Sequence, residues 1–565
     1  MIKKISLIGL IVCIAFIANA QTNTIPRGWH LLDYAKDSVY GISLQKAYDF
    51  LSEKNKKSVP VIVAVIDGGI DTAHPDLKNV LWTNPHEIAG NNIDDDGNGY
   101  VDDIHGWNFL GNKDGSCLKK ASDEKTRVYY KFKNQYATAQ LDTSSMDAND
   151  KYEYNTWQRA ANEMKSNGDD EMELNFLDII LKSLKRNDSI LCQEMGVKEF
   201  SIDQLENYQP KTNQSKDAKF AFLTSMRLME KEGDDKNDAV ISELDNYVSG
   251  KKESLDAKTN APKDYRAYII KDNYNNIQDK FYGNNNVKGP DAMHGTHVAG
   301  IIAAQRNNGI GIDGVADNVK VMAVRAVPDG DEYDKDVALS IFYAVNNGAK
   351  VINMSFGKAY SPEKKWVDSA IEYAQQKDVL IIHAAGNEST DIDIKENFPS
   401  PYFLSTATKA PNFITVGASG DEKLKGTMAA DFSNFGKQNV DVFAPGVKIY
   451  STLPENQYGN LNGTSMAAPI VTGLAALIRE YYPELTAQQV KEIIETSVSV
   501  PDSSFITIKP GTKNDIIPFS SLSKTGGIVN AYNAVKAADT LEQTIVNKEE
   551  ENKTHLKKNK KTKKQ

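Results

Sequence analysis

The sequence predicts an α/β fold with a mostly parallel central sheet, interrupted by a largely helical insertion. Continuous apolar runs recur along the chain, and segments with helical spacing separate them. Apolar runs without alternation suit strands buried on both faces, and alternating strands and helices are typical of parallel sheets. One long polar stretch breaks the alternation and predicts the insertion.

The first apolar run covers 59–67, reads VPVIVAVID and ends at Asp67. The other apolar runs are 319–324, 350–356, 379–385, 413–418 and 440–444. Helical spacing appears between them, at 335–347 and 363–377. Ligands of such sheets bind at the C-terminal ends of the strands, so the polar residues that follow the runs are the candidate functional residues.

The N-terminal residues 1–20 predict a secretory signal peptide. Lys3 and Lys4 precede an apolar run that ends in small residues, with cleavage expected after Ala20. The run is short for a bilayer span, so we expect no stable membrane anchor and a secreted or periplasmic protein. Residues 21–58 then form a short N-terminal segment.

Charge and cysteine content argue against some classes of protein. The formal net charge is −10, although the tail 541–565 ends LKKNKKTKKQ and is expected to be basic and disordered. An acidic body argues against nucleic-acid binding. Two cysteines, Cys117 and Cys192, remain after the signal peptide; they do not make a disulfide scaffold, and their pairing stays open.

The insertion covers 113–287 and divides the predicted catalytic domain into 59–112 and 288–540. It is rich in Lys, Asp and Asn, with apolar residues at helical spacing near 171–186 and 217–230. We therefore expect a largely helical insertion. A partly disordered acidic and basic loop is the alternative.

Three side chains supply the groups that nucleophilic acyl transfer requires. Ser465, in GTSMAAP, begins an apolar helix with Pro469 expected in its first turn, and His294 opens a second apolar helix. A serine needs a base to take its proton, and a histidine needs an acid to fix its tautomer, a role that Asp67 can fill. Asn387 follows a buried strand, where its amide can donate to an oxyanion; such a donor contributes about 3–4 kcal/mol.

Five sequence blocks resemble the subtilisin-like serine proteases. They are VAVIDGGI around Asp67, HGTHVAG from His294, NMSFG at 353–357, AAGNE at 384–388 and GTSMAAP around Ser465, and they follow the family's order of Asp, His and Ser. The resemblance covers 59–112 and 288–538 and implies the three-layer subtilisin-like fold.

The resemblance also implies roles for the residues in these blocks. Ser465 would be the nucleophile, His294 the general base and then acid, and Asp67 the group that orients His294. The N–H of Ser465 and the side chain of Asn387 would form the oxyanion hole. Substrate would pair as an added strand with Ser355, Phe356 and Gly357, while Ala384, Ala385 and Gly386 would line the pocket for the residue before the cut.

The chain departs from the family pattern in three places. Gly68 stands where many members have Ser, a change that removes one possible hydrogen bond to Asp67. The insertion separates Asp67 from His294, and the segment 21–58 is shorter than the usual inhibitory pro-domain. We therefore expect the insertion to do part of the work of a pro-domain.

The segment 91–103, NNIDDDGNGYVDD, predicts a calcium site. Asp94, Asp96 and Asn98 alternate, Gly99 permits a turn, and Tyr100 can offer its carbonyl, as in the first half of an EF-hand loop. The bidentate Glu is missing, and Asp102 or Asp103 is expected to take its place. Crowded carboxylates repel one another unless a hard cation such as Ca²⁺ neutralises them. An acidic surface turn is the alternative.

The sequence therefore predicts a secreted serine endopeptidase that acts on proteins or peptides through an acyl-enzyme. Two alternatives stay open: an inactive binding module with the same fold, and a peptidase that the insertion limits to short peptides. The sequence gives no indication of the oligomeric state.

Overall fold

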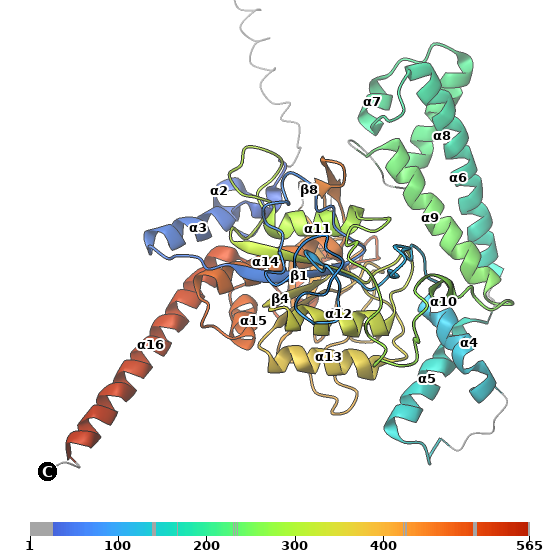
Figure 1. The fold of residues 1–565 in the computed structure, drawn as a ribbon. Helices are drawn as coiled ribbons and strands as arrows, with labels where there is room; N and C mark the ends of the chain where they lie inside the picture. Colours follow the sequence, from blue (N-terminus) through green and yellow to red (C-terminus); the bar gives the residue numbers. More distant parts are fainter. Residues whose placement is uncertain are drawn as a thin grey trace, which may run out of the picture. The chain divides into compact units, whose positions relative to one another are not determined.

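The computed structural model describes residues 26–562, except 138–142, 166–167, 230, 232, 234, 422, 424–426 and 501–504. The chain forms two compact units, Met1–Lys119 with Ile269–Gln565, and Lys120–Tyr268 (Figure 1). The predicted signal peptide, residues 1–20, lies outside the described residues. The first unit contains the sheet, and the second contains most of the predicted insertion.

The first unit is built on a seven-stranded parallel sheet, which confirms the predicted fold class. Its strands are β1 (Val61–Asp67), β2 (Gly106–Asn108), β3 (Val319–Arg325), β4 (Val351–Met354), β5 (Leu380–Ala384), β6 (Phe413–Ser419) and β7 (Val442–Pro445), in the order β2-β3-β1-β4-β5-β6-β7. Each predicted apolar run forms one of these strands. The short strand β2 has no such run. Its Gly106 has φ 131°, and a Cβ there would lie 1.8 Å from the carbonyl oxygen of Ala323.

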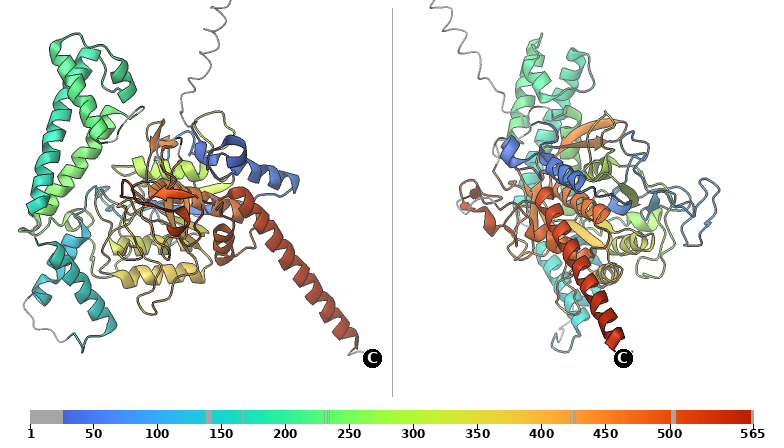
Figure 2. Two further views of the ribbon diagram at one scale, coloured as in Figure 1. Left: turned by 180° about the vertical axis from the view of Figure 1, so that it is seen from behind. Right: turned by 90° about the vertical axis from the view of Figure 1, so that its left-hand side faces the viewer.

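Helices cover both faces of the sheet (Figures 1 and 2). One face packs against α11 (Met293–Ala303) and α14 (Thr464–Tyr481), and the other packs against α12 (Asp334–Asn346) and α13 (Lys364–Gln376). The remaining elements of this unit are η1 (Trp29–Leu31), α2 (Tyr34–Asp37), α3 (Leu44–Glu53), α15 (Ala487–Thr496), η3 (Phe519–Ser521), α16 (Ala531–Thr562) and the hairpins β8 (Ile449–Leu453)/β9 (Gln457–Leu461) and β10 (Ile506–Ile508)/β11 (Ile516–Pro518).

Helix α14 is the central helix of the core. Its aliphatic side chains Ile470, Leu474 and Leu477 are fully buried in the hydrophobic core. The helix packs against the strands of the sheet and against α11. Burying each such side chain contributes about 1.5–3 kcal/mol. This packing fixes the position of the first turn of α14, which carries Ser465.

The N-terminal segment belongs to the core of the first unit. Trp29 is 1% exposed, and its Nε1 donates to the carbonyl of Val447 at 3.0 Å. Leu51 on α3 is equally buried, and α3 packs against α16. The backbone N–H of Ala531 also donates to the carbonyl of Ile42 at 2.7 Å. Residues 26–58 are therefore integrated into the folded unit.

The second unit is helical. Its helices are α4 (Glu124–Tyr136), α5 (Ala148–Glu163), α6 (Gly168–Met195), α7 (Ile202–Asn207), α8 (Asn213–Leu228) and α9 (Asn237–Asp256), followed by α10 (Tyr265–Ile269) at its boundary. Leu184, Leu191 and Phe222 form part of its own buried core. The compact unit is shorter than the predicted 113–287, because residues 113–119 and 269–287 pack with the first unit.

The C-terminal region differs from the prediction of a disordered tail over 541–565. Helix α16 continues through Thr562, and Figure 2 shows it running outward from the layers. Leu541 and Ile545, spaced four residues apart, pack against the core and extend the helix into this range. Among the described residues, no helix is both long enough and apolar enough to span a membrane.

Candidate active site

Asp67 and His294 form a hydrogen-bonded pair at the C-terminal end of β1. Asp67 is 2% exposed, and its Oδ1 and Oδ2 lie 2.9 and 3.0 Å from Nδ1 of His294. The N–H of Gly68 donates to Oδ1 at 2.7 Å. A Cβ on Gly295 would lie 2.3 Å from the carbonyl oxygen of Gly69, so only glycine lets α11 approach β1 this closely. The carboxylate thus fixes the orientation of the imidazole.

The pair also sets the proton affinity of His294. Burial lowers the pKa of this imidazole, but the charge of Asp67 and the hydrogen bond to it raise the pKa more, so that it lies above 6.5. A base whose protonated form is stabilised by a neighbouring carboxylate is suited to accept the proton of a nucleophile.

Ser465 lies at the same edge of the sheet. It is the second residue of α14, and its Oγ donates to the carbonyl of Ser355 at 3.1 Å. Ser355 follows β4, the neighbour of β1 in the sheet. Among the described residues, Ser465 Oγ makes no hydrogen bond to His294. Such bonds often form only when substrate is bound, and the serine is already at the edge that carries the Asp67–His294 pair.

The turn that carries Ser465 is anchored by Ser355. Helix α14 begins at Thr464, so Pro469 lies in its second turn, and the expectation of a first-turn proline was wrong. A proline has no N–H to donate to the carbonyl four residues earlier, which is that of Ser465. The hydroxyl of Ser355 donates to this carbonyl instead, at 3.0 Å, and Asn353 Nδ2 donates to the same hydroxyl at 3.0 Å.

Asn387 lies next to the first turn of α14. Its Oδ1 accepts hydrogen bonds from the backbone N–H and the hydroxyl of Thr464, at 2.8 and 3.0 Å. Its Nδ2 donates to no other side chain or backbone group in the described part of the chain, and the residue is exposed. The amide is therefore held by its oxygen, which leaves the nitrogen available to an incoming oxyanion.

The predicted substrate-binding residues lie on two neighbouring strands. These residues are Ser355, Phe356 and Gly357, directly after β4, and Ala384, Ala385 and Gly386, at the end of β5. The two strands pair as far as Met354 and His383. His383 is 1% exposed, and its Nε2 lies 2.8 Å from the carbonyl oxygen of Phe356. Burial lowers the pKa of His383 to about 4, so the ring is neutral and holds the Phe356 segment through this hydrogen bond. A histidine that interrupts the apolar run 379–385 was the signal for this role in the sequence.

The acidic loop brings together only part of the predicted ligand set. Carboxylate oxygens of Glu87, Asp96 and Asp103 lie within 4.8 Å of one another. Burial raises the pKa of Asp103 to about 6, although Tyr343 and Asn84 donate hydrogen bonds to it. Glu87 lies outside the segment 91–103 and was missed, because its distance from Asp96 along the sequence gave no spacing signal.

The remaining predicted ligands have other contacts in the loop. The carboxylate of Asp94 accepts the N–H of Gly99 at 2.8 Å. The carboxylate of Asp102 accepts the N–H groups of Gly90 and Asn92, both at 2.8 Å. Asn98 Nδ2 donates to Asp96 and Asp103, at 3.1 and 3.2 Å. The ring of Tyr100 is buried against Trp107. Asp94 and Asp102 thus shape the loop, while Asp96 and Asp103 converge.

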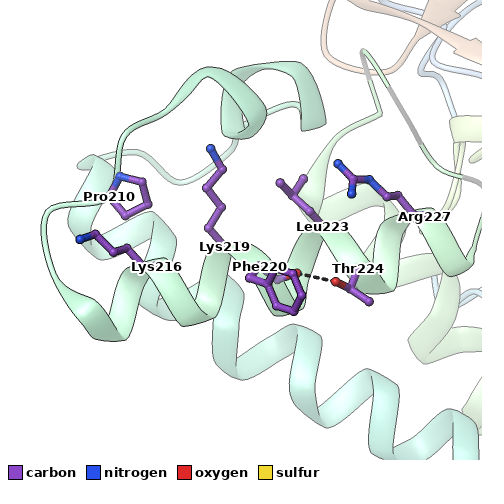
Figure 3. Close-up of a pocket in the computed structure, with 7 residues that line it drawn as sticks. All are labelled: Pro210, Lys216, Lys219, Phe220, Leu223, Thr224 and Arg227. Atoms are coloured by element: carbon purple, nitrogen blue, oxygen red, sulfur yellow. Dashed lines mark hydrogen bonds between the residues drawn. The ribbon is translucent and has the colours of Figure 1, made fainter.

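The second unit carries a pocket of a different kind (Figure 3). Seven residues line it, and they are Pro210, Lys216, Lys219, Phe220, Leu223, Thr224 and Arg227. The Thr224 hydroxyl donates to the carbonyl of Phe220 at 2.8 Å, and Lys219 Nζ donates to the carbonyls of Glu206 and Tyr208. The lining holds no acid and base pair, so it offers no second candidate active site.

Comparison with known proteins identifies the family. The model of the subtilase family matches residues 59–534. The chain is 37% identical over 249 residues to a thermophilic serine proteinase of Bacillus sp. (strain AK1), a match that covers 43% of this chain and 52% of that protein. It is 37% identical over 213 residues to subtilisin DY of Bacillus licheniformis, with 38% of this chain and 72% of the relative covered.

A solved structure, that of the prenylagaramide maturation protease PagA, is 29% identical to this chain. The likeness covers 44% of this chain and 82% of that one, with a TM-score of 0.36. The chain spans about half the length of the Bacillus sp. proteinase. The family match over 59–534 confirms the resemblance seen in the sequence, and the chain belongs to the subtilase family.

Proposed function

We propose that this chain is a secreted serine-type endopeptidase that hydrolyses peptide bonds of proteins through an acyl-enzyme. The observation that carries the proposal is the Asp67–His294 pair, which lies at the same sheet edge as Ser465. Membership of the subtilase family supports it, as does the similarity to a thermophilic serine proteinase and to subtilisin DY. Secretion rests on the leader predicted over residues 1–20.

The proposed reaction uses each group in turn. The hydroxyl of Ser465 leaves the Ser355 carbonyl and gives its proton to Nε2 of His294 while Oγ attacks the substrate carbonyl carbon. The backbone N–H of Ser465 and Nδ2 of Asn387 stabilise the oxyanion. Protonated His294 then gives the proton to the leaving amine as the C–N bond breaks. Water then attacks the acyl carbon while His294 takes its proton; the bond to Ser465 Oγ breaks, the acid is released, and His294 returns the proton to the serine.

A serine-directed phosphonate probe tests the proposal. We expect the folded protein to be labelled and Ser465→Ala to lose the label, because only an activated serine attacks phosphorus. Ser369→Ala, which removes an exposed hydroxyl on α13, is the matched control and should keep it. Absence of label on the folded wild type would instead favour a binding module. Cleavage of a tetrapeptide but not of casein would favour a peptidase limited to short peptides.

We also propose that Glu87, Asp96 and Asp103 bind a calcium ion that stabilises the fold. The three carboxylates converge, and hard oxygen ligands are those that Ca²⁺ prefers. Burial is the main cause of the raised pKa of Asp103, and the charge of Asp96 adds to it. A bound cation would compensate this repulsion between the two carboxylates. The ligand set differs from the sequence prediction by including Glu87.

Chelation should therefore lower the thermal midpoint of unfolding. A ligand present at 100 times its Kd stabilises the folded state by about 2.7 kcal/mol, and EDTA removes this contribution. We expect Asp96→Asn to shrink the shift that EDTA causes in differential scanning calorimetry. Asp95→Asn, which changes an adjacent carboxylate outside the converging group, should leave the shift intact. Equal EDTA shifts in the wild type and in Asp96→Asn would contradict the site.

A further inference from the structure

Arg325 is a buried cation beside the catalytic carboxylate. It is the last residue of β3, and in the sheet it is level with Asp67 on β1 and with Asn108 on β2. Its side chain is 1% exposed. Burial lowers its pKa to about 10, so it stays cationic at neutral pH.

The guanidinium binds three neutral oxygen atoms. Nε donates to the carbonyl of Gly68 at 2.7 Å, Nη1 donates to Oδ1 of Asn108 at 3.1 Å, and Nη2 donates to the carbonyl of Leu118 at 2.7 Å. No carboxylate of the described residues lies within ion-pair distance of it. A buried charge without a counter-ion is costly unless hydrogen bonds satisfy it. The fixed fork of Arg325 therefore holds two backbone carbonyls and the side chain of Asn108 at one point.

One of these groups, the carbonyl of Gly68, belongs to the residue that contacts Asp67. The N–H of Gly68 donates to Asp67 Oδ1 at 2.7 Å, while the carbonyl of Gly68 accepts from Arg325. A glycine has the widest backbone freedom of any residue, so its peptide groups keep a direction only when other groups restrain them. The carbonyl of Asp67, in the same peptide group as the Gly68 N–H, accepts from the N–H groups of Ala326 and Val327 at 3.0 and 3.2 Å, and Arg325 restrains the peptide group that follows Gly68. Together these bonds keep the N–H aimed at the carboxylate.

We propose that Arg325 is a positioning residue for the catalytic carboxylate: by fixing Gly68 it holds Asp67 in the orientation that binds Nδ1 of His294. The inference rests on the proposed function of these residues. It assigns Arg325 a role in kcat rather than in substrate binding, because none of its contacts reaches the substrate-binding residues.

The kinetic test is Arg325→Met in the full chain. Because a small misplacement of a catalytic group costs about 10²-fold in rate, we expect kcat to fall by about that factor with KM unchanged. In an Asp67→Asn background the same change should have no further effect, since Arg325 acts through Asp67. Arg306→Met is the matched control, because Arg306 also donates to a backbone carbonyl, that of Gly314, and should leave kcat unchanged.

A second measurement does not depend on activity. In a Ser465→Ala background, NMR titration of His294 should show that Arg325→Met lowers its pKa, because a displaced Asp67 raises it less. Arg325→Lys keeps the charge with a single donor group and should lower kcat and this pKa by smaller amounts, so it decides the question if Arg325→Met does not fold.

Two results would overturn the inference. The first is that the folded Arg325 variants keep both the wild-type kcat and the wild-type pKa of His294. The second is that Arg325→Met lowers kcat equally in the wild-type and Asp67→Asn backgrounds, which would indicate a general structural role. An inactive and unlabelled wild type would contradict the proposed function instead, and the His294 titration would still test Arg325.

Discussion

Ser465→Ala is expected to lower kcat for peptide hydrolysis by about 10⁶-fold, the size of the effect that the corresponding change has in a subtilisin. The physical reason is that alanine has no oxygen to form the acyl-enzyme. What should remain is the background rate of the proposed site, in which the N–H of residue 465 and Asn387 stabilise the oxyanion.

The same kinetic assay tests whether Ser465 and His294 act as a unit. His294→Ala should cost about as much as Ser465→Ala, and the double variant should be no slower than either single one, because the serine is inert without its base. Hydrolysis of a chromogenic peptide under single-turnover conditions measures these rates, with Ser369→Ala as the control. A Ser465→Ala protein within about 10³-fold of the wild-type kcat would rule out this serine as the nucleophile.

Asp67→Asn is expected to lower kcat by about 10⁴-fold at neutral pH. The amide keeps the size of the carboxylate but can present an N–H to Nδ1 of His294, and this favours the tautomer that cannot accept the proton of Ser465. The 2.9 and 3.0 Å contacts of the two carboxylate oxygens with Nδ1 are the interactions that change.

The pH profile separates this effect from a general loss of structure. In the wild type, kcat/KM should rise with pH through the raised pKa of His294, above 6.5, since only the neutral imidazole acts as a base. In Asp67→Asn this limb should move to lower pH, because the charge that stabilises the imidazolium is gone. Asp291→Asn, which removes a nearby charge without a hydrogen bond to His294, should change kcat far less. An unmoved limb in Asp67→Asn would contradict the pairing.

The order of strands and helices was predictable because buried parallel strands require continuous apolar runs. The runs that end at Asp67 and at Ala385 predicted that the candidate groups Asp67 and Asn387 follow the C-terminal ends of strands, and the structure has both there. The strand Gly106–Asn108 was not predictable, since its pairing with β3 rather than its own composition makes it a strand. Helix α16 extends beyond 541 because Leu541 and Ile545 find a surface to pack on, which local composition does not reveal.

The family, the strand-forming segments and the chemical types at Asp67, His294, Asn387 and Ser465 follow from local sequence. These are local properties, set by the side chains and their immediate neighbours. The distant groups that support them emerge only from the folded chain: Ser355 on the carbonyl of Ser465, and Arg325 on that of Gly68. Tertiary structure also decided that Glu87 joins Asp96 and Asp103. Hydrogen bonds and charge interactions depend on distances in space, and those distances exist only once the sheet and its loops have assembled.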